Sequence, residues 1–134
     1  TREWSGSSPV RIIIDRTLSI PKEYTIMDES VKTIVLTESQ KKSADQLIYE
    51  TIDLSNNSVK NICDTLYKHN IQSVVVEGGL ATLKRFIDAS IWDEARVFIS
   101  DQLLQEGIKA PVIEKDIYSE VPVDSDTLIL YNNY

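Results

Sequence analysis

A glutamate and two glycines, Glu77-Gly78-Gly79, stand between an apolar run and a helical pattern near the middle of the chain. Residues 71–76 are typical of a buried strand, and the apolar spacing from Leu80 onward is typical of a helix. Such a helix start can bind phosphate or pyrophosphate, because its N–H groups carry partial positive charge and the glycines leave the backbone accessible. The outward N–H groups would be those of Gly79, Leu80, Ala81 and Thr82.

The same turn has a plainer interpretation, which is a tight connection that binds no ligand. It lacks the third glycine of the GxGxxG fingerprint of dinucleotide sites. Glu77 also leaves two alternatives open. Its carboxylate caps the next helix or pairs with a basic side chain, or it accepts hydrogen bonds from the sugar hydroxyls or ring N–H groups of a ligand. Because a carboxylate repels phosphate, we do not expect Glu77 to touch the phosphate itself.

Asp15 and Arg16 follow a second apolar run, residues 10–14, which is also typical of a buried strand. Ligands of open α/β sheets bind beyond the carboxyl ends of the strands. Arg16 could therefore bind an anionic group such as the 2′-phosphate that distinguishes NADP from NAD. The alternative is an exposed loop arginine. Arg2, beside the first residue, is expected from its spacing alone to be a solvated terminal side chain.

Other chemistries are short of candidate residues. The chain has one cysteine, Cys63, and one histidine, His69. No disulfide can form within the chain, and a Cys/His zinc cluster or a Ser-His-Asp triad has few candidates. We find no metal-ligand spacing and expect no metal.

The positioning elements are predicted from the hydrophobic periodicity. Three short strands come first, and two helices then alternate with further strands. This order favours an α/β fold with a largely parallel sheet flanked by helices. The last strand follows a long loop and is expected to return antiparallel at an edge. Strands are predicted at residues 10–14, 32–37, 47–53, 71–76, 93–100 and 127–131, and helices at 59–67 and from 80 to about 89–90.

The length of 134 residues is that of one domain, so we expect a single domain over residues 1–134. The net charge of -7 argues against a nucleic-acid partner, which would require a basic face. No long apolar run predicts a membrane span or a signal peptide, so we expect a cytoplasmic protein. The chain begins with Thr1 rather than Met, which suggests a processed or excised piece.

Several segments together resemble one family. They are Pro9-Val10-Arg11-Ile12-Ile13-Ile14-Asp15, Val75-Val76-Glu77-Gly78-Gly79, Phe86-Ile87-Asp88, Trp92-Asp93-Glu94-Ala95-Arg96 and Gly107-Ile108-Lys109-Ala110-Pro111, in that order. The chain resembles the C-terminal reductase domain of the bifunctional riboflavin-biosynthesis deaminase/reductase, which is similar in fold to dihydrofolate reductase. The resemblance runs from Thr1 to about Pro111.

The resemblance implies an activity and site residues. The family uses NADPH to reduce the ribose of 5-amino-6-(5-phosphoribosylamino)uracil, and it is commonly dimeric. By resemblance, Glu77 and Arg2 contact the substrate, and Arg16 lies beside the cofactor. No catalytic residue is assigned. The residues implied to hold the NADP phosphates are Gly79, Leu80, Ala81, Thr82 and Leu83.

The chain also departs from the family. The Asp-Asp-Pro segment that precedes the residue matched by Arg2, the opening strand and helix of the reductase domain, and the zinc deaminase domain have no counterpart here. We therefore expect the later part of a reductase domain, with little turnover in isolation. The alternatives are a non-catalytic nucleotide-binding or assembly module of the same fold, and a related reductase acting on another heterocycle.

Overall fold

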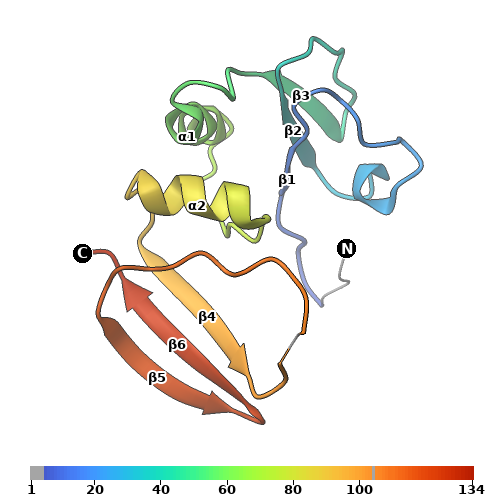
Figure 1. Cartoon of the computed structure of the whole chain (residues 1–134). Coiled ribbons are helices and arrows are strands. Elements are labelled where there is room, and N and C mark those ends of the chain that lie inside the picture. The colour runs from blue at the N-terminus through green and yellow to red at the C-terminus, as the bar shows by residue number, and fades with distance from the viewer. Residues whose placement is uncertain (1–4, 104) are drawn as a thin grey trace. The chain divides into compact units, whose positions relative to one another are not determined.

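The computed structural model describes residues 5–103 and 105–134. Contacts between Cα atoms divide the chain into two compact units, Thr1–Ser73 and Val74–Tyr134. Figure 1 shows that each unit has one sheet and one α-helix. The expectation of a single domain over residues 1–134 stays a prediction, and the units are described separately below.

The sheet of the first unit is parallel throughout. It consists of β1 (Arg11–Ile14), β2 (Thr33–Thr37) and β3 (Leu47–Thr51), with β2 in the centre. All five residues of β2 are buried, as expected for the central strand of a parallel sheet covered on both faces. The strands predicted at residues 10–14, 32–37 and 47–53 are thus confirmed, and this sheet is parallel as the expected fold class has it.

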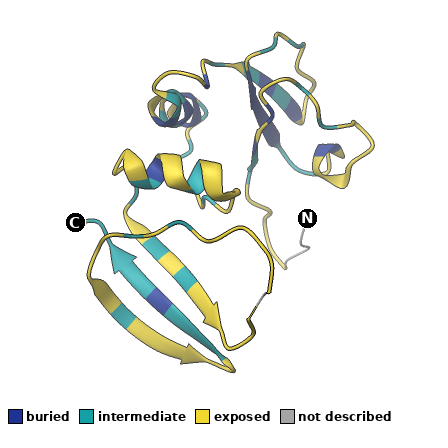
Figure 2. Cartoon of the chain, viewed as in Figure 1, coloured by how far each residue is buried: buried dark blue, intermediate teal, exposed yellow. Residues whose placement is uncertain are grey.

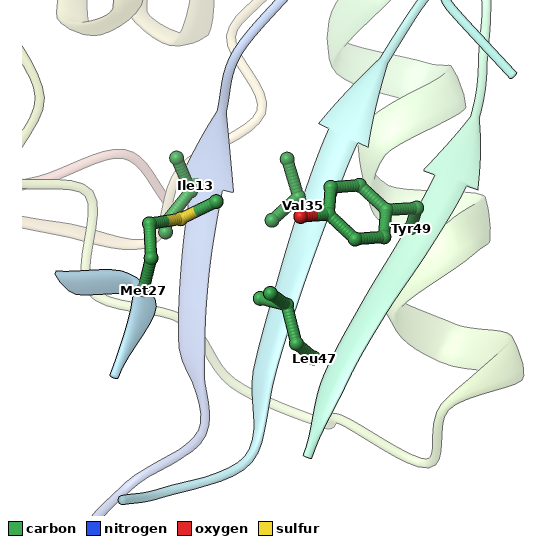
Figure 3. Close-up of a cluster of buried hydrophobic side chains, with 5 residues drawn as sticks. All are labelled: Ile13, Met27, Val35, Leu47 and Tyr49. Carbon is green, nitrogen blue, oxygen red and sulfur yellow. The ribbon is translucent and has the colours of Figure 1, made fainter. Parts of the chain in front are cut away.

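Alternate residues of β2 face two different layers of the core. Val35 aligns with Ile13 and Tyr49 on the two neighbouring strands, and these side chains form one cluster with Leu47 and Met27 (Figure 3). Met27 belongs to the short 3-10 helix η1 (Thr25–Met27), which follows β1 along the chain.

Helix α1 (Ser58–Lys68) lies on the other face of this sheet. Its buried side chains include Val59, Ile62 and Leu66, at the spacing of one helical stripe. His69 directly follows the helix, and its Nε2 lies 2.7 Å from Oε1 of Glu50 on β3. Because Glu50 aligns with Leu36 rather than with the Val35 layer, this contact holds the end of α1 over the second face.

The second unit contains helix α2 (Leu80–Asp88) and an antiparallel sheet. The strands are β4 (Glu94–Ser100), β5 (Ile117–Val123) and β6 (Asp126–Asn132), in the order β4-β6-β5. Asn133 joins the connection between α2 and β4 to the end of β6. Its Nδ2 donates to the carbonyl oxygens of Ser90 and Trp92 at 3.1 and 3.0 Å.

Two predicted features of the sheet are wrong. Residues 71–76 have no regular secondary structure and pair with no strand among the described residues, and Val75 is 83% exposed. An apolar run indicates that a segment is buried, but the segment forms a strand only where another strand pairs with it. The parallel sheet also does not continue to residues 93–100, because β4 belongs to a separate antiparallel sheet.

The carboxyl-terminal region differs from the prediction as well. β6 runs antiparallel to its neighbours as expected, but it lies in the centre of its sheet rather than at an edge. The edge position belongs to β5, in a region predicted to be loop. β5 contains Pro122, which an edge strand tolerates. No helix of the described residues is long and apolar enough to cross a membrane.

Candidate functional site

The two glycines before α2 have different structural roles. A Cβ added at Gly78 would lie 3.1 Å from Cβ of Thr82, which is closer than ordinary packing allows. A Cβ added at Gly79 would meet no atom within 4 Å. Gly78 is therefore closely packed against the side chain of Thr82, which would have to shift to accept a larger residue. The backbone at Gly79 is open instead, as the approach of a ligand to this helix start would require.

The first turn of α2 uses one of the N–H groups that were expected to point outward. Gly79 is the N-cap residue, and its carbonyl oxygen accepts hydrogen bonds from the backbone N–H groups of Thr82 at 2.9 Å and Leu83 at 3.2 Å. The prediction of an outward N–H is thus wrong for Thr82, because the helix begins with a tight turn. Gly79, Leu80 and Ala81 remain as the N–H groups at the start of the helix.

Glu77 lies beside this turn with an exposed side chain. Among the residues that the structure describes, it has no hydrogen-bond or ion-pair partner, and no side chain caps α2. The interpretation of Glu77 as a helix cap or a partner of a basic side chain finds no support in these contacts. Its carboxylate is therefore accessible to a ligand.

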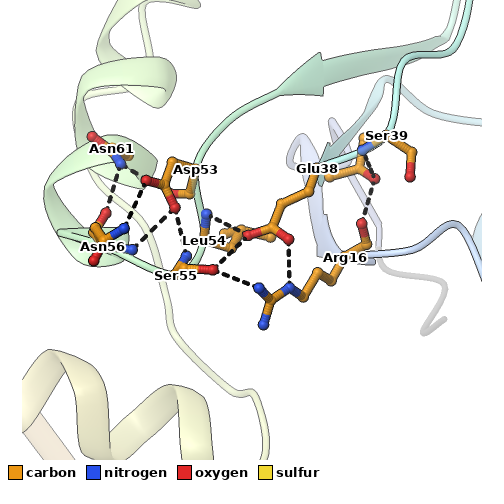
Figure 4. A network of polar contacts seen from close by, with 9 residues as sticks. Arg16, Glu38, Ser39, Asp53, Leu54, Ser55, Asn56 and Asn61 are labelled. Carbon is orange, nitrogen blue, oxygen red and sulfur yellow. Dashed lines mark hydrogen bonds and ion pairs between the residues drawn. The ribbon is translucent and has the colours of Figure 1, made fainter.

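Arg16 lies in the first unit and belongs to a polar network at the carboxyl ends of the strands (Figure 4). Its Nε lies 2.5 Å from Oε2 of Glu38, the residue after β2. Its Nη2 donates to Oγ of Ser55, which precedes α1, at 2.5 Å. The side chain of Arg16 is still 52% exposed. The guanidinium is thus fixed along one edge and accessible to solvent elsewhere.

Glu38 is the centre of that network. Its other oxygen, Oε1, accepts hydrogen bonds from the backbone N–H of Leu54 and from Oγ of Ser55, both at 3.1 Å. The hydrogen bond from Arg16 is the main reason that the pKa of Glu38 lies below its ordinary value. The carboxylate is therefore ionised at neutral pH and neutralises the charge of Arg16.

Asp53 extends the network to the start of α1. Its carboxylate accepts hydrogen bonds from the backbone N–H groups of Asn56 at 3.0 Å and Ser55 at 2.7 Å, which lower its pKa. Asn61, on the first turn of α1, donates to the carbonyl oxygens of Asp53 and Asn56. These bonds hold the loop before α1 in place, so that Ser55 reaches Arg16.

Asp15, the neighbour of Arg16, has a structural role. Its side chain is buried, and its oxygens accept hydrogen bonds from the backbone N–H groups of Ser19 and Ile20 at 2.8 and 2.9 Å. Burial alone raises the pKa of Asp15. These bonds and a third from the Ser19 hydroxyl together lower it by more, so that the pKa lies below its ordinary value of 3.8. The carboxylate thus fixes the loop that begins with Arg16.

The predicted site residues are distributed over both units. Arg16 lies in the first, Glu77 and the residues from Gly79 to Leu83 lie in the second, and Arg2 lies outside the described residues. Sequence reasoning missed Glu38 and Ser55. One signal was present for Glu38, because it follows a strand that is parallel to β1 and ends at the same edge of the sheet.

Comparison with known proteins identifies the family. The sequence profile of the RibD C-terminal domain matches residues 1–111. This chain belongs to the RibD C-terminal domain family. The riboflavin biosynthesis protein RibD of Aquifex aeolicus (strain VF5) is 33% identical over 104 residues, which are 75% of this chain and 29% of that protein.

Solved structures agree in fold. A diaminohydroxyphosphoribosylaminopyrimidine deaminase/5-amino-6-(5-phosphoribosylamino)uracil reductase from Thermotoga maritima is 27% identical, with a TM-score of 0.78 over 96% of this chain and 38% of that one. Acinetobacter baumannii RibD, form 2, is 17% identical with a TM-score of 0.70, over 98% of this chain and 41% of that one. The chain thus spans well under half the length of these RibD proteins.

NADPH is the cofactor that the RibD family implies, and two parts of this chain carry groups that could bind its phosphates. Gly79 leaves the space beside the start of α2 open, and the N–H groups there suit a phosphate. Arg16 offers a half-exposed guanidinium, whose surface away from Glu38 and Ser55 can meet an anionic group. Each feature, taken within its own unit, could bind a phosphate of the cofactor. No group of three or more potential metal ligands occurs among residues 5–103 and 105–134.

Proposed function

We propose that this chain is the reductase part of a riboflavin-biosynthesis enzyme, acting on the ribose of 5-amino-6-(5-phosphoribosylamino)uracil in the cytoplasm. The observation that carries the proposal is the match of residues 1–111 to the RibD C-terminal domain. When bound, NADPH supplies the hydride. The protein then needs to bind and orient two ligands rather than provide a nucleophile.

Each predicted residue has a part in this proposal. The helix start from Gly79 to Leu83 holds the pyrophosphate of NADPH, and Arg16 holds its 2′-phosphate. Glu77 and Arg2 bind the substrate, with the Glu77 carboxylate accepting hydrogen bonds from hydroxyl or N–H groups. The accessible carboxylate of Glu77 and the open backbone at Gly79 support these assignments.

Calorimetric titration with NADPH tests the cofactor part. The variant Gly79→Val adds a side chain where there is open space, so it should fold normally and weaken NADPH binding about tenfold or more, a loss of about 1.4 kcal/mol. Ala89→Val is the matched control, because it enlarges an exposed residue at the other end of α2. Absence of NADPH binding, or equal affinity in both variants, would contradict the proposed site.

Turnover tests the reaction itself. NADPH oxidation with the authentic substrate is expected to be very slow with residues 1–134 alone, because they span only 38% of the Thermotoga maritima deaminase/reductase. Rapid turnover would contradict that expectation. NADPH binding and reduction of a different heterocycle would favour the related reductase, and loss of both would favour a non-catalytic assembly module.

We also propose that the chain forms a homodimer. Phe98, Leu128 and Val121 are aligned across the second sheet, and Phe98 is 62% exposed while Val121 is 40% exposed. An exposed apolar row of this kind favours association. Light scattering at high concentration should therefore give the mass of a dimer, and Phe98→Lys should shift it toward the monomer. A monomeric wild-type chain would contradict the proposal.

A further inference from the structure

Arg16 presents its guanidinium in an arrangement that does not favour phosphate alone. Nε and Nη2 form the edge of the guanidinium that commonly binds an oxyanion side-on. Here Glu38 takes the hydrogen bond from Nε, and Ser55 takes that from Nη2. A phosphate that bound to this edge would have to displace the Glu38 carboxylate.

The carboxylate is also held independently of Arg16. Oε1 of Glu38 accepts the backbone N–H of Leu54 and the hydroxyl of Ser55. If the guanidinium turned away from Glu38 to bind a phosphate, the Glu38 carboxylate would therefore stay in place. Its negative charge would then lie close to that phosphate. Asp53 is a second carboxylate close enough to Arg16 for the charge of Arg16 to lower its pKa. These two carboxylates outnumber the single positive charge of Arg16.

Acidic and basic side chains have opposite preferences at such a position. A carboxylate at the end of a strand accepts hydrogen bonds from the ribose hydroxyls of NAD, whereas an arginine accommodates the 2′-phosphate of NADP. Here both are present and paired with each other. Glu38 therefore weakens the binding of a 2′-phosphate while offering acceptors to a ribose that lacks one.

We propose that Glu38 sets the cofactor preference of this chain, so that adenine nucleotides with and without a 2′-phosphate bind with similar affinity. The inference rests on the proposed binding of NADPH near Arg16. Glu38 acts through the position and charge of Arg16, and it is a specificity-determining rather than a catalytic residue.

The test compares two probes, 2′,5′-ADP and 5′-AMP, by NMR titration of the folded chain. The wild-type chain should bind them with dissociation constants within about threefold of each other. Glu38→Gln keeps an oxygen for Leu54 but removes the charge, and it should favour 2′,5′-ADP by about tenfold, the size expected for removing one nearby like charge in water. Adding Arg16→Gln should abolish that gain.

Two controls separate charge from structure. Asp28→Asn breaks a comparable ion pair, Arg11–Asp28 at 2.9 Å, at the other end of β1, and it should leave the affinity ratio unchanged. Ser55→Ala removes the second contact of the guanidinium while keeping the Glu38 charge, and it should also leave the ratio near the wild-type value. Thermal unfolding of each variant verifies that it is folded.

The outcomes distinguish the inference from the proposed function. A wild-type chain that already prefers 2′,5′-ADP by tenfold would overturn the inference without any variant. If Glu38→Gln leaves the ratio unchanged while Arg16→Gln weakens 2′,5′-ADP, the inference fails and the proposed role of Arg16 stands. If Arg16→Gln changes neither affinity, or neither probe binds, the role of Arg16 fails and the inference falls with it.

Discussion

The two units differ most in how completely their central strands are buried. In the first unit every residue of β2 is buried, whereas in the second unit only Ile129 of the central strand β6 is buried (Figure 2). Edge strand β4 contains no buried residue and carries Phe98, which is 62% exposed. The first unit therefore contains most of the apolar burial that stabilises the described chain, and the second presents apolar surface to solvent.

The largest effect that would test this difference in burial comes from replacing one leucine by alanine in each unit. Leu36 in β2 is fully buried, at 0% exposure. Leu36→Ala should lower the unfolding free energy by about 2–5 kcal/mol, because the substitution leaves a cavity. Leu103→Ala in the second unit should change it by less than about 0.5 kcal/mol, since Leu103 is 93% exposed. Urea unfolding followed by circular dichroism measures both, and equal losses would contradict the comparison.

Burial also explains which elements could be predicted from the sequence. β1, β2 and α1 were predicted because the local apolar pattern specifies which of their residues are buried. Asn70 follows α1 in the left-handed conformation, with φ 59°, that commonly ends a helix. Residues 71–76 have an equally clear pattern, but a strand also needs a partner, and no local signal specifies one. β5 lacks a clear pattern but has a partner strand. It was missed because its pairing with β6 depends on register rather than on its own composition.

The candidate site was predictable to a similar extent. Arg16 and the turn at Gly79 follow from strand ends and glycines, which are local signals. The Glu38–Arg16 contact joins residues 22 apart in sequence, and the Ser55 contact joins residues 39 apart. Their meeting depends on the parallel register of the sheet and on the loop that Asp53 fixes, neither of which can be derived from spacing.

The next largest effect concerns the buried carboxylate of the first unit. Asp15→Asn should lower the unfolding free energy by about 1.5–3 kcal/mol at pH 7, because charge-assisted hydrogen bonds to the Ser19 and Ile20 backbone are weakened. Asp45→Asn, at an exposed aspartate of the same unit, is the control and should have little effect. A matching loss in both variants would show that charge alone, rather than the Asp15 bonds, stabilises the unit.

The pH dependence of the same carboxylate has a definite sign. The pKa of Asp15 is lower in the folded state than its ordinary 3.8, so its contribution is fully present above that value. It is lost progressively as the pH falls through the folded-state pKa. The difference in stability between wild type and Asp15→Asn should therefore shrink below about pH 4, which acid titrations of urea unfolding measure.

In the second unit the corresponding test is the tight turn before α2. Gly78→Ala should cost roughly 1–2 kcal/mol, because the new Cβ would lie 3.1 Å from Cβ of Thr82. Gly79→Ala meets no atom within 4 Å and should change stability by less than about 1 kcal/mol. Thermal unfolding compares the two variants. A larger loss for Gly79→Ala would mean that the open space is not what separates the two glycines.

The smallest effect is expected where the two units do not differ. Lys60–Asp64 on α1 and Lys84–Asp88 on α2 are both exposed ion pairs at i, i+4 spacing, at 2.5 and 2.8 Å. In both, lysine precedes the acid, the less favourable orientation relative to the helix dipole. Lys60→Gln and Lys84→Gln should each cost only about 0.2–0.5 kcal/mol, and 1 M salt should remove most of it. If Lys60→Gln cost several times more than Lys84→Gln in urea unfolding, the units would differ in their surface electrostatics as well as in their burial. Equal small losses would confine the difference to the packing of apolar side chains.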